Sequence, residues 1–278
     1  MASILALTAA MAYGAGDFLG GVASRRAPTT AVVLWSHVVG LVVLLTAAPL
    51  VGGELTAQDT LVGAGAGLVG VLGVVLFYQG LSIGSMSVVA PVAGLLSAAV
   101  PVLAGIVSGE RPGVTALVGI TLALTAITLV SRESHADAEA SSHGLQALLL
   151  AIGAGIAFGL FFVALKTTSD GAGIWPLVGA RTASVTLLGS LGLARLIQAA
   201  PPRDAGTPAI GAGVLDAAAN VFYLLALTQG MLSVVAVLTA LYPAGTVLLA
   251  RFSLGERMSS VQRTGLAVAG VSALMIAI

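Results

Sequence analysis

The chain has 278 residues, of which 58% are hydrophobic and only 8% are charged, and it contains no cysteine. A soluble domain usually carries about 25% charged residues, so this composition excludes a water-soluble globule. Eleven basic residues balance eleven acidic ones, which leaves no basic surface for a nucleic-acid partner. Without cysteine there is neither a disulfide framework nor a thiolate nucleophile. The 36 glycines favour closely packed helices, and the whole composition predicts a multi-pass membrane protein.

Long runs without Asp, Glu, Lys or Arg locate ten predicted membrane-spanning helices, because about 20 apolar residues are needed to cross the hydrocarbon core. These runs lack the alternation of apolar and polar residues that a barrel strand requires, so we expect an all-α membrane protein. The predicted spans, in chain order, are 2–22, 30–50, 59–80, 84–107, 112–131, 145–166, 173–198, 208–229, 231–252 and 259–278.

One long polar stretch interrupts this series, and it is interpreted as a solvated linker over residues 132–144. It contains His135 and His143, but no second pair of ligands stands near them in the sequence. No metal site is therefore predicted, and no phosphate-binding loop or other cofactor motif is present in the sequence.

The linker separates two halves, residues 1–131 and 145–278, that resemble each other at an offset of 146 residues. The Ser-Val-Val-Ala block that begins at Ser87 returns at Ser233, and Gly109-Glu110-Arg111 returns as Gly255-Glu256-Arg257. Each half holds five predicted spans. Because five is odd, the second half must enter the membrane inverted relative to the first. Inverted repeats are typical of secondary transporters, whose substrate site lies near the midplane between the repeats.

Four Asp, Arg or His residues lie well inside predicted spans, five or more residues from either end, namely Asp17, His37, Arg181 and Asp216. A charged side chain at the bilayer centre costs about 2.5–3.5 kcal/mol on insertion scales, so such residues are candidates for function. We expect all four to meet around a central cavity as candidates for binding substrate or protons, with Asn220 as a further polar candidate. The alternatives are a helix-end contact for Asp17, a packing role for His37, a structural ion pair between Arg181 and Asp216, and a helix–helix contact for Asn220.

Two further sets of residues suggest helix-end and hinge roles. The helix-end set is the Gly-Glu-Arg motif, in which a glutamate suits the N-terminus of the following helix; its residues are Glu110, Arg111, Glu256 and Arg257. The hinge set is prolines inside the fourth and ninth spans, which remove backbone hydrogen bonds and could form gates or static bends. They are Pro91, Pro101 and Pro243.

Ten spans arranged as five plus five, with Gly-Glu-Arg after the fourth helix of each half, resemble the drug/metabolite transporter superfamily and its EamA-like branch. The block from Asp17 to Arg26 and the block from Ala240 to Thr246 are also similar to bacterial members. The resemblance implies export or exchange of small metabolites, often amino acids. It also implies that helices one to four and six to nine line the cavity, with five and ten outside. The family often carries an arginine on its second and seventh helices; Arg181 fits the seventh, whereas His37 stands near that place on the second.

The sequence therefore predicts a secondary transporter of the cell membrane, an exporter or exchanger that works by alternating access. Its expected partners are a small-molecule substrate and the lipid bilayer, and no oligomeric state is assigned. An integral-membrane enzyme is one alternative, although it would need a nucleophile–base pair or clustered ligands. A channel-like protein is the other, although nothing in the sequence indicates a symmetric filter.

Overall fold

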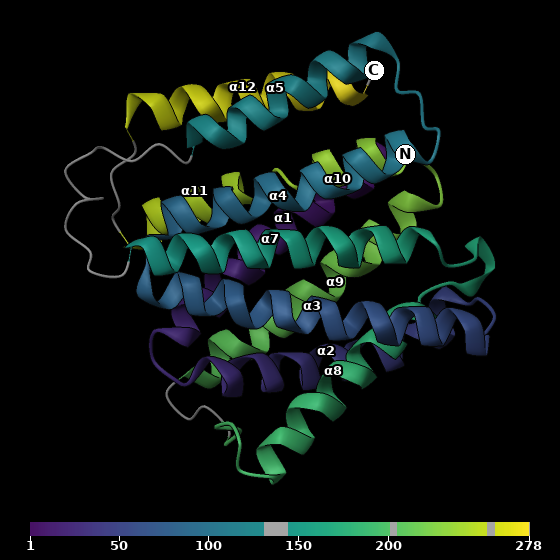
Figure 1. Cartoon of the computed structure of the whole chain (residues 1–278), viewed down its shortest axis with the longest axis vertical. Coiled ribbons are helices and arrows are strands. Elements are labelled where there is room, and N and C mark those ends of the chain that lie inside the picture. Colours follow the sequence, from purple (N-terminus) through teal and green to yellow (C-terminus); the bar gives the residue numbers. More distant parts are fainter. Residues whose placement is uncertain (131–143, 201–204, 255–258, 278) are drawn as a thin grey trace.

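A computed structural model of the chain describes residues 1–130, 144–200, 205–254 and 259–277. Over these residues the chain is helical and contains no strand (Figure 1). In chain order the elements are α1 (Ala2–Ser24), α2 (Thr29–Val51), α3 (Ala57–Ile83), α4 (Met86–Val107), α5 (Val114–Val130), α7 (Gly144–Lys166), the short 3-10 helix η1 (Asp170–Ala172), α8 (Trp175–Leu193), α9 (Gly206–Leu227), α10 (Leu232–Thr239), α11 (Tyr242–Leu254) and α12 (Ser260–Ala277).

Every predicted span except 231–252 coincides with one helix, within a few residues at most ends. Span 231–252 is wrong as a single helix, because α10 ends at Thr239 and α11 begins at Tyr242. Pro243, the second residue of α11, has no N–H to donate and suits a first turn. The Ala244 N–H donates to the Leu241 carbonyl at 3.0 Å across this break. By contrast, α4 continues as one helix past both Pro91 and Pro101.

Six helices are long and apolar enough to cross a membrane, namely α1, α2, α3, α4, α7 and α9. Shorter apolar helices cover residues 114–129, 232–246 and 260–276. Helix α8 has 19 residues and carries the charged Arg181, which lowers its hydropathy. The fold is thus that of an all-helical membrane protein, and ten crossings remain a prediction. The predicted linker, apart from Gly144, lies outside the described residues, as do Glu256 and Arg257.

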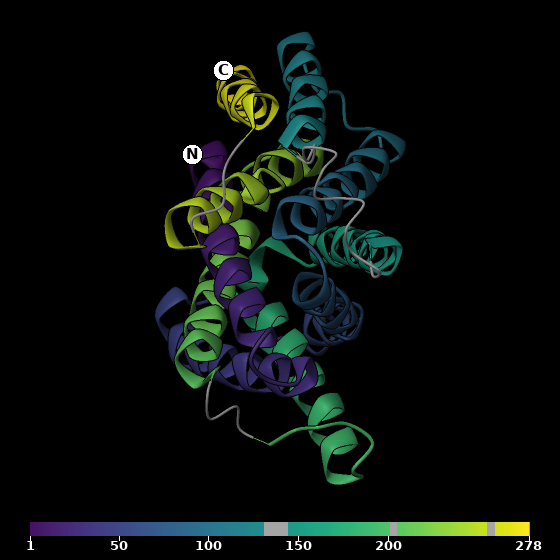
Figure 2. The same cartoon turned by 90° about the vertical axis from the view of Figure 1, so that its left-hand side faces the viewer.

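Helices of the two halves contact each other in matched pairs. The counterparts of α1, α2 and α3 in the second half are α7, α8 and α9. The contact of α1 with α9 is matched by that of α7 with α3, and the contact of α2 with α9 is matched by that of α8 with α3. Helix α4 contacts α7, and its counterparts α10 and α11 contact α1. Helices α5 and α12 lie side by side along one edge of the molecule (Figures 1 and 2). The two halves are therefore interleaved, so that most large contacts join one half to the other.

Glycines set the distance between the halves at two equivalent positions. A Cβ atom at Gly67 of α3 would lie 2.2 Å from the carbonyl oxygen of Ala180 in α8. A Cβ atom at Gly213 of α9 would lie 2.2 Å from the carbonyl oxygen of Ser36 in α2. Gly213 follows Gly67 by 146 residues, the offset of the sequence repeat. Each half thus brings its third helix into backbone contact with the second helix of the other half, as small residues allow in membranes.

The first Gly-Glu-Arg motif joins the two halves. The Glu110 carboxylate accepts the Leu232 N–H at 2.6 Å and the Ser233 N–H at 3.0 Å, and so caps the N-terminus of α10. Glu110 therefore caps a helix N-terminus as expected, but the expected helix is wrong. The capped helix is α10 of the other half and not α5, which follows Glu110 in the chain. Two free N–H groups at a helix start and a carboxylate are complementary in charge. The side chain of Arg111 is exposed.

Alanine at Gly63 should lower the stability of the protein. Its Cβ would lie 2.0 Å from the Pro176 carbonyl oxygen, a backbone atom that cannot withdraw without separating α3 from α8. We expect a loss of about 1–3 kcal/mol, measured as a lower apparent Tm of the detergent-solubilised protein. Gly65→Ala is the matched control, because no atom lies within 4 Å of a Cβ there. Equal Tm values for the two variants would contradict this close contact.

Candidate functional site

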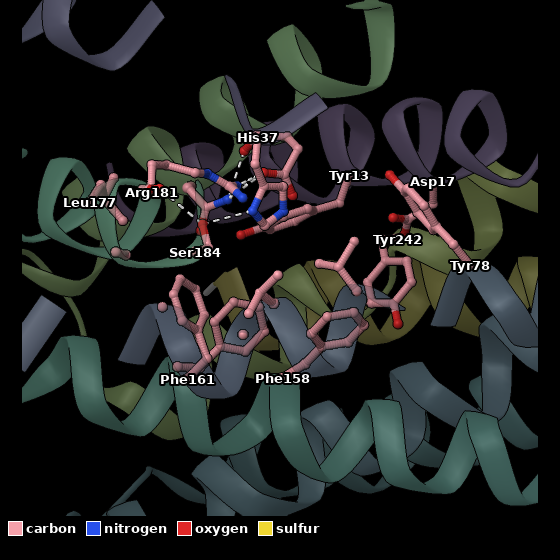
Figure 3. Close-up of a pocket in the computed structure, with 18 residues that line it drawn as sticks. Tyr13, Asp17, His37, Tyr78, Phe158, Phe161, Leu177, Arg181, Ser184 and Tyr242 are labelled. Atoms are coloured by element: carbon pink, nitrogen blue, oxygen red, sulfur yellow. Dashed lines mark hydrogen bonds and ion pairs between the residues drawn. The ribbon is translucent and has the colours of Figure 1, made fainter. Parts of the chain in front are cut away.

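A cavity lies between the two halves and draws its lining from both (Figure 3). The first half contributes residues of α1, α2 and α3, and the second contributes residues of α7, α8, α9 and α11. Helices α5 and α12 contribute none of the described lining, as the family resemblance implied, whereas α4 was expected to contribute and does not. All five polar candidates predicted from the sequence line this cavity: Asp17, His37, Arg181, Asp216 and Asn220.

Arg181 of α8 and Asp216 of α9 form an ion pair at the cavity wall. The side chain of Arg181 is 10% exposed and that of Asp216 is 21% exposed, so the pair is largely withdrawn from solvent. Asn220, one helical turn beyond Asp216, donates its amide to the Asp216 carbonyl oxygen at 2.7 Å and to Oδ2 at 3.2 Å. The carboxylate is thus oriented by two side chains, and Asp216 also lines the cavity.

His37 is tied to this cluster through Ser184, which sequence analysis did not single out. Ser184 Oγ donates to the Arg181 carbonyl oxygen at 3.0 Å and lies 2.8 Å from His37 Nδ1. A hydroxyl has only one proton to donate. With that proton directed at the Arg181 carbonyl, His37 Nδ1 donates to Ser184 Oγ, and His37 Nε2 has no hydrogen-bond partner among the described residues. Ser184 lies three residues after Arg181, so helical spacing from Arg181 could have identified it.

Asp17 lies at the other end of the cavity from Arg181 (Figure 3). Tyr78 and Tyr242 are its labelled neighbours there, and Tyr13 lies between Asp17 and the Arg181 cluster. The prediction that the four ionisable residues lie together around one cavity is therefore confirmed only in part. They share one cavity, but Arg181, Asp216 and His37 gather at one end and Asp17 stands alone at the other.

An aromatic wall faces these polar groups, and sequence analysis missed it. Three residues of α7 form it, Phe158, Phe161 and Phe162, all of which line the cavity. Phe162 stacks on Tyr223 with ring centroids 4.2 Å apart, and Phe158 meets Phe77 edge-on at 5.6 Å. The spacing of 158, 161 and 162 places all three on one helical face, which is the signal that could have found them.

Several buried polar atoms on the cavity lining have no hydrogen-bond partner among the described residues. They include Tyr13 Oη, His37 Nε2 and Asn220 Oδ1. A buried polar atom left unpaired costs about 1–3 kcal/mol, so such atoms call for a partner. No three His, Asp or Glu residues gather as metal ligands in the described part of the chain. The unpaired atoms offer a phenol hydroxyl, an imidazole nitrogen and an amide oxygen as hydrogen-bonding groups.

The prolines and the helix-end motif lie outside this lining. Pro91, Pro101, Pro243, Glu110 and Arg111 are not among the residues of the cavity wall. Pro243 instead packs against α4, since a Cβ at Gly94 would lie 2.7 Å from Pro243 Cγ. Gating by these prolines stays a prediction.

The model of the EamA-like transporter family matches residues 1–132 and matches again over residues 145–278. The chain belongs to the EamA-like transporter family. As an EamA-like protein with several apolar helices it is a multi-pass membrane protein of a transporter family, built from two repeats. No curated protein matches the chain.

A solved crystal structure, described only as that of a protein, has the same fold as this EamA-like chain. The TM-score is 0.75 at 16% sequence identity, and the match covers 99% of this chain and 95% of the other. At this identity the likeness concerns the fold alone. It covers both repeats, so the whole EamA-like architecture described above has a solved counterpart.

Proposed function

We propose that this protein is a secondary transporter that exports or exchanges small metabolites, such as amino acids, across the cell membrane by alternating access. The observation that carries the proposal is the cavity between the two repeats, which is lined from both and contains unpaired polar atoms. In secondary transporters the substrate site lies at the interface of the repeats. A movement of one repeat against the other would then expose the site to each side of the membrane in turn.

We further propose that residues 1–131 and 145–278 are inverted repeats of five spans each, which together make ten crossings. The matched pairs of helices support this, since exchanging the two halves reproduces the largest contacts between helices. The positions of the helix ends agree, because α1 begins and α12 ends at the same end of the molecule, as an even number of crossings requires (Figure 1).

Within this mechanism we assign the main ionisable role to Asp216. Its counterpart in the first repeat, 146 residues earlier, is Gly70, so the carboxylate exists in only one half. Arg181 would hold this carboxylate charged or bind an anionic group of the substrate. Pro91, Pro101 and Pro243 would provide the hinges at which α4, α10 and α11 bend.

Single cysteines should report the inversion directly, since the chain has none of its own. Ser108 follows the end of α4 and Ser253 lies near the end of α11, and both are exposed. If the repeats are inverted, S108C and S253C react with an impermeant maleimide from opposite sides of the membrane. Labelling of both from the same side would contradict the inversion.

Transport should saturate and show counterflow. A screen in an efflux-deficient host identifies the substrate, and proteoliposomes preloaded with it should then accumulate labelled substrate transiently above the external concentration. This overshoot arises because the carrier takes unlabelled substrate out of the liposome and returns with labelled substrate bound, so that label is exchanged inward. Protein-free liposomes are the control. Flux that rises linearly with concentration and shows no overshoot would indicate a channel-like protein instead.

Asp216→Asn should leave the yield of folded protein unchanged and abolish transport, because it removes the charge and keeps the shape. Asp170→Asn, at an exposed site, is the control and should transport normally. A purely structural pair behaves differently, because breaking it strands Arg181 and costs about 3–5 kcal/mol. In that case the yield falls, and Asp216→Asn combined with Arg181→Gln restores both yield and transport. Such a restoration would contradict the assignment of Asp216.

A further inference from the structure

Asp17 carries a carboxylate that no basic group accompanies. Among the described residues the ion pair formed inside the molecule joins Arg181 to Asp216, and no hydrogen bond or ion pair involves the Asp17 side chain. Nevertheless Asp17 lines the central cavity, at the end away from Arg181. The cavity lining therefore holds two carboxyl groups and one guanidinium, and Asp17 is the carboxyl group that has no basic partner.

Tyrosines of two other helices lie near this carboxylate because glycines on both sides of it let those helices approach α1 (Figure 3). A Cβ at Gly20, three residues after Asp17, would lie 2.0 Å from Tyr78 Cζ, so the Tyr78 ring rests on the α1 backbone. A Cβ at Gly14, three residues before Asp17, would lie 2.6 Å from the Tyr242 carbonyl oxygen, which brings the start of α11 against α1.

A third ring comes from α1 itself. Tyr13 precedes Asp17 by four residues and so lies on the same helical face. Its ring centroid is 6.3 Å from that of Tyr242. Figure 3 shows the Asp17 carboxylate beside Tyr78 and Tyr242, with Tyr13 the next labelled residue along the cavity. Tyr13, Tyr78 and Tyr242 are each no more than 9% exposed, so the site is shielded.

We propose that Asp17 and these three tyrosines form a cation subsite that takes an alkylammonium group of the transported molecule. A carboxylate binds an ammonium by a charge-assisted hydrogen bond, and aromatic rings attract cations through their electron-rich faces, as in the aromatic cages that bind quaternary ammonium ligands. A free carboxylate or phosphate group is repelled by Asp17. The neighbouring wall of Phe158 and Phe161 suits an apolar or aromatic body on the same molecule. This inference rests on the proposed transport function.

The test compares three ligands of similar shape on the purified full-length protein by isothermal titration calorimetry. Phenethylamine carries the ammonium, 2-phenylethanol is its neutral counterpart, and 3-phenylpropionate is an anionic one. We expect phenethylamine to bind at least about tenfold more tightly than the other two. Equal affinity for the amine and the alcohol in the wild-type protein would overturn the subsite, and this comparison needs no variant to fold.

Variants then assign the residues. Asp17→Asn should weaken phenethylamine at least about tenfold, and Glu54→Gln, an exposed acidic position, should leave its affinity unchanged. Tyr78→Leu should weaken it roughly fivefold, whereas Tyr78→Phe keeps the ring and should retain most of the affinity. Unchanged binding by Asp17→Asn would overturn the proposal.

The two proposals fail separately. If phenethylamine binding depends on Asp17 but no substrate shows counterflow, the subsite stands and the transport function is wrong. If counterflow is observed and phenethylamine binds Asp17→Asn as well as the wild type, transport stands and the subsite is wrong.

Discussion

The constraint on which this structure depends is that a helix end surrounded by apolar groups must find partners for its free N–H and C=O groups without water. Three side chains meet this need across the gaps between helices. Glu110 caps the start of α10, Arg25 donates to the Leu81 carbonyl at the end of α3 at 3.2 Å, and Lys166 donates to the Leu227 carbonyl at the end of α9 at 2.9 Å. These three charged side chains are thus placed at helix ends, where each also joins two helices.

These caps follow the repeat. Leu81 and Leu227 are separated by 146 residues, and each receives a basic side chain from the C-terminal end of the first helix of its own half: Arg25 directly follows α1, and Lys166 is the last residue of α7. Glu110 instead crosses between halves to reach α10. This Glu110 cap and the backbone contacts at Gly67 and Gly213 hold the two halves face to face. The polar cavity is the space that remains between them, and this explains why a cavity lined from both halves exists at all.

The sequence predicted the helices well and the site only partly, for one physical reason. Charge-free runs reflect the thickness of the membrane, so helix positions could be inferred from local composition. The break between α10 and α11 could not be inferred so simply, because α4 tolerates Pro91 and Pro101 without breaking. Ionisable residues were found because they are costly in lipid. The wall of Phe158 and Phe161 and the rings around Asp17 were missed because an aromatic residue in an apolar helix carries no such cost. Its role depends on which helix it faces.

The symmetry of the halves also explains how one site can have two chemically different ends. Gly70 and Val74 of α3 line the cavity, and so do Asp216 and Asn220, the residues 146 positions later in α9. On α1 and α7, where the offset is 145, Tyr13 corresponds to Phe158 and Asp17 to Phe162, and all four line the cavity. The repeat thus supplies equivalent positions on both sides of the cavity, and substitution at those positions supplies polarity to one side only. Asp17 arises in the first half and Asp216 in the second, each opposite an apolar equivalent. The repeated backbone alone would allow a bound molecule two equivalent orientations. The different side chains at the two ends of the cavity would leave only one orientation for a molecule with an ammonium at one end.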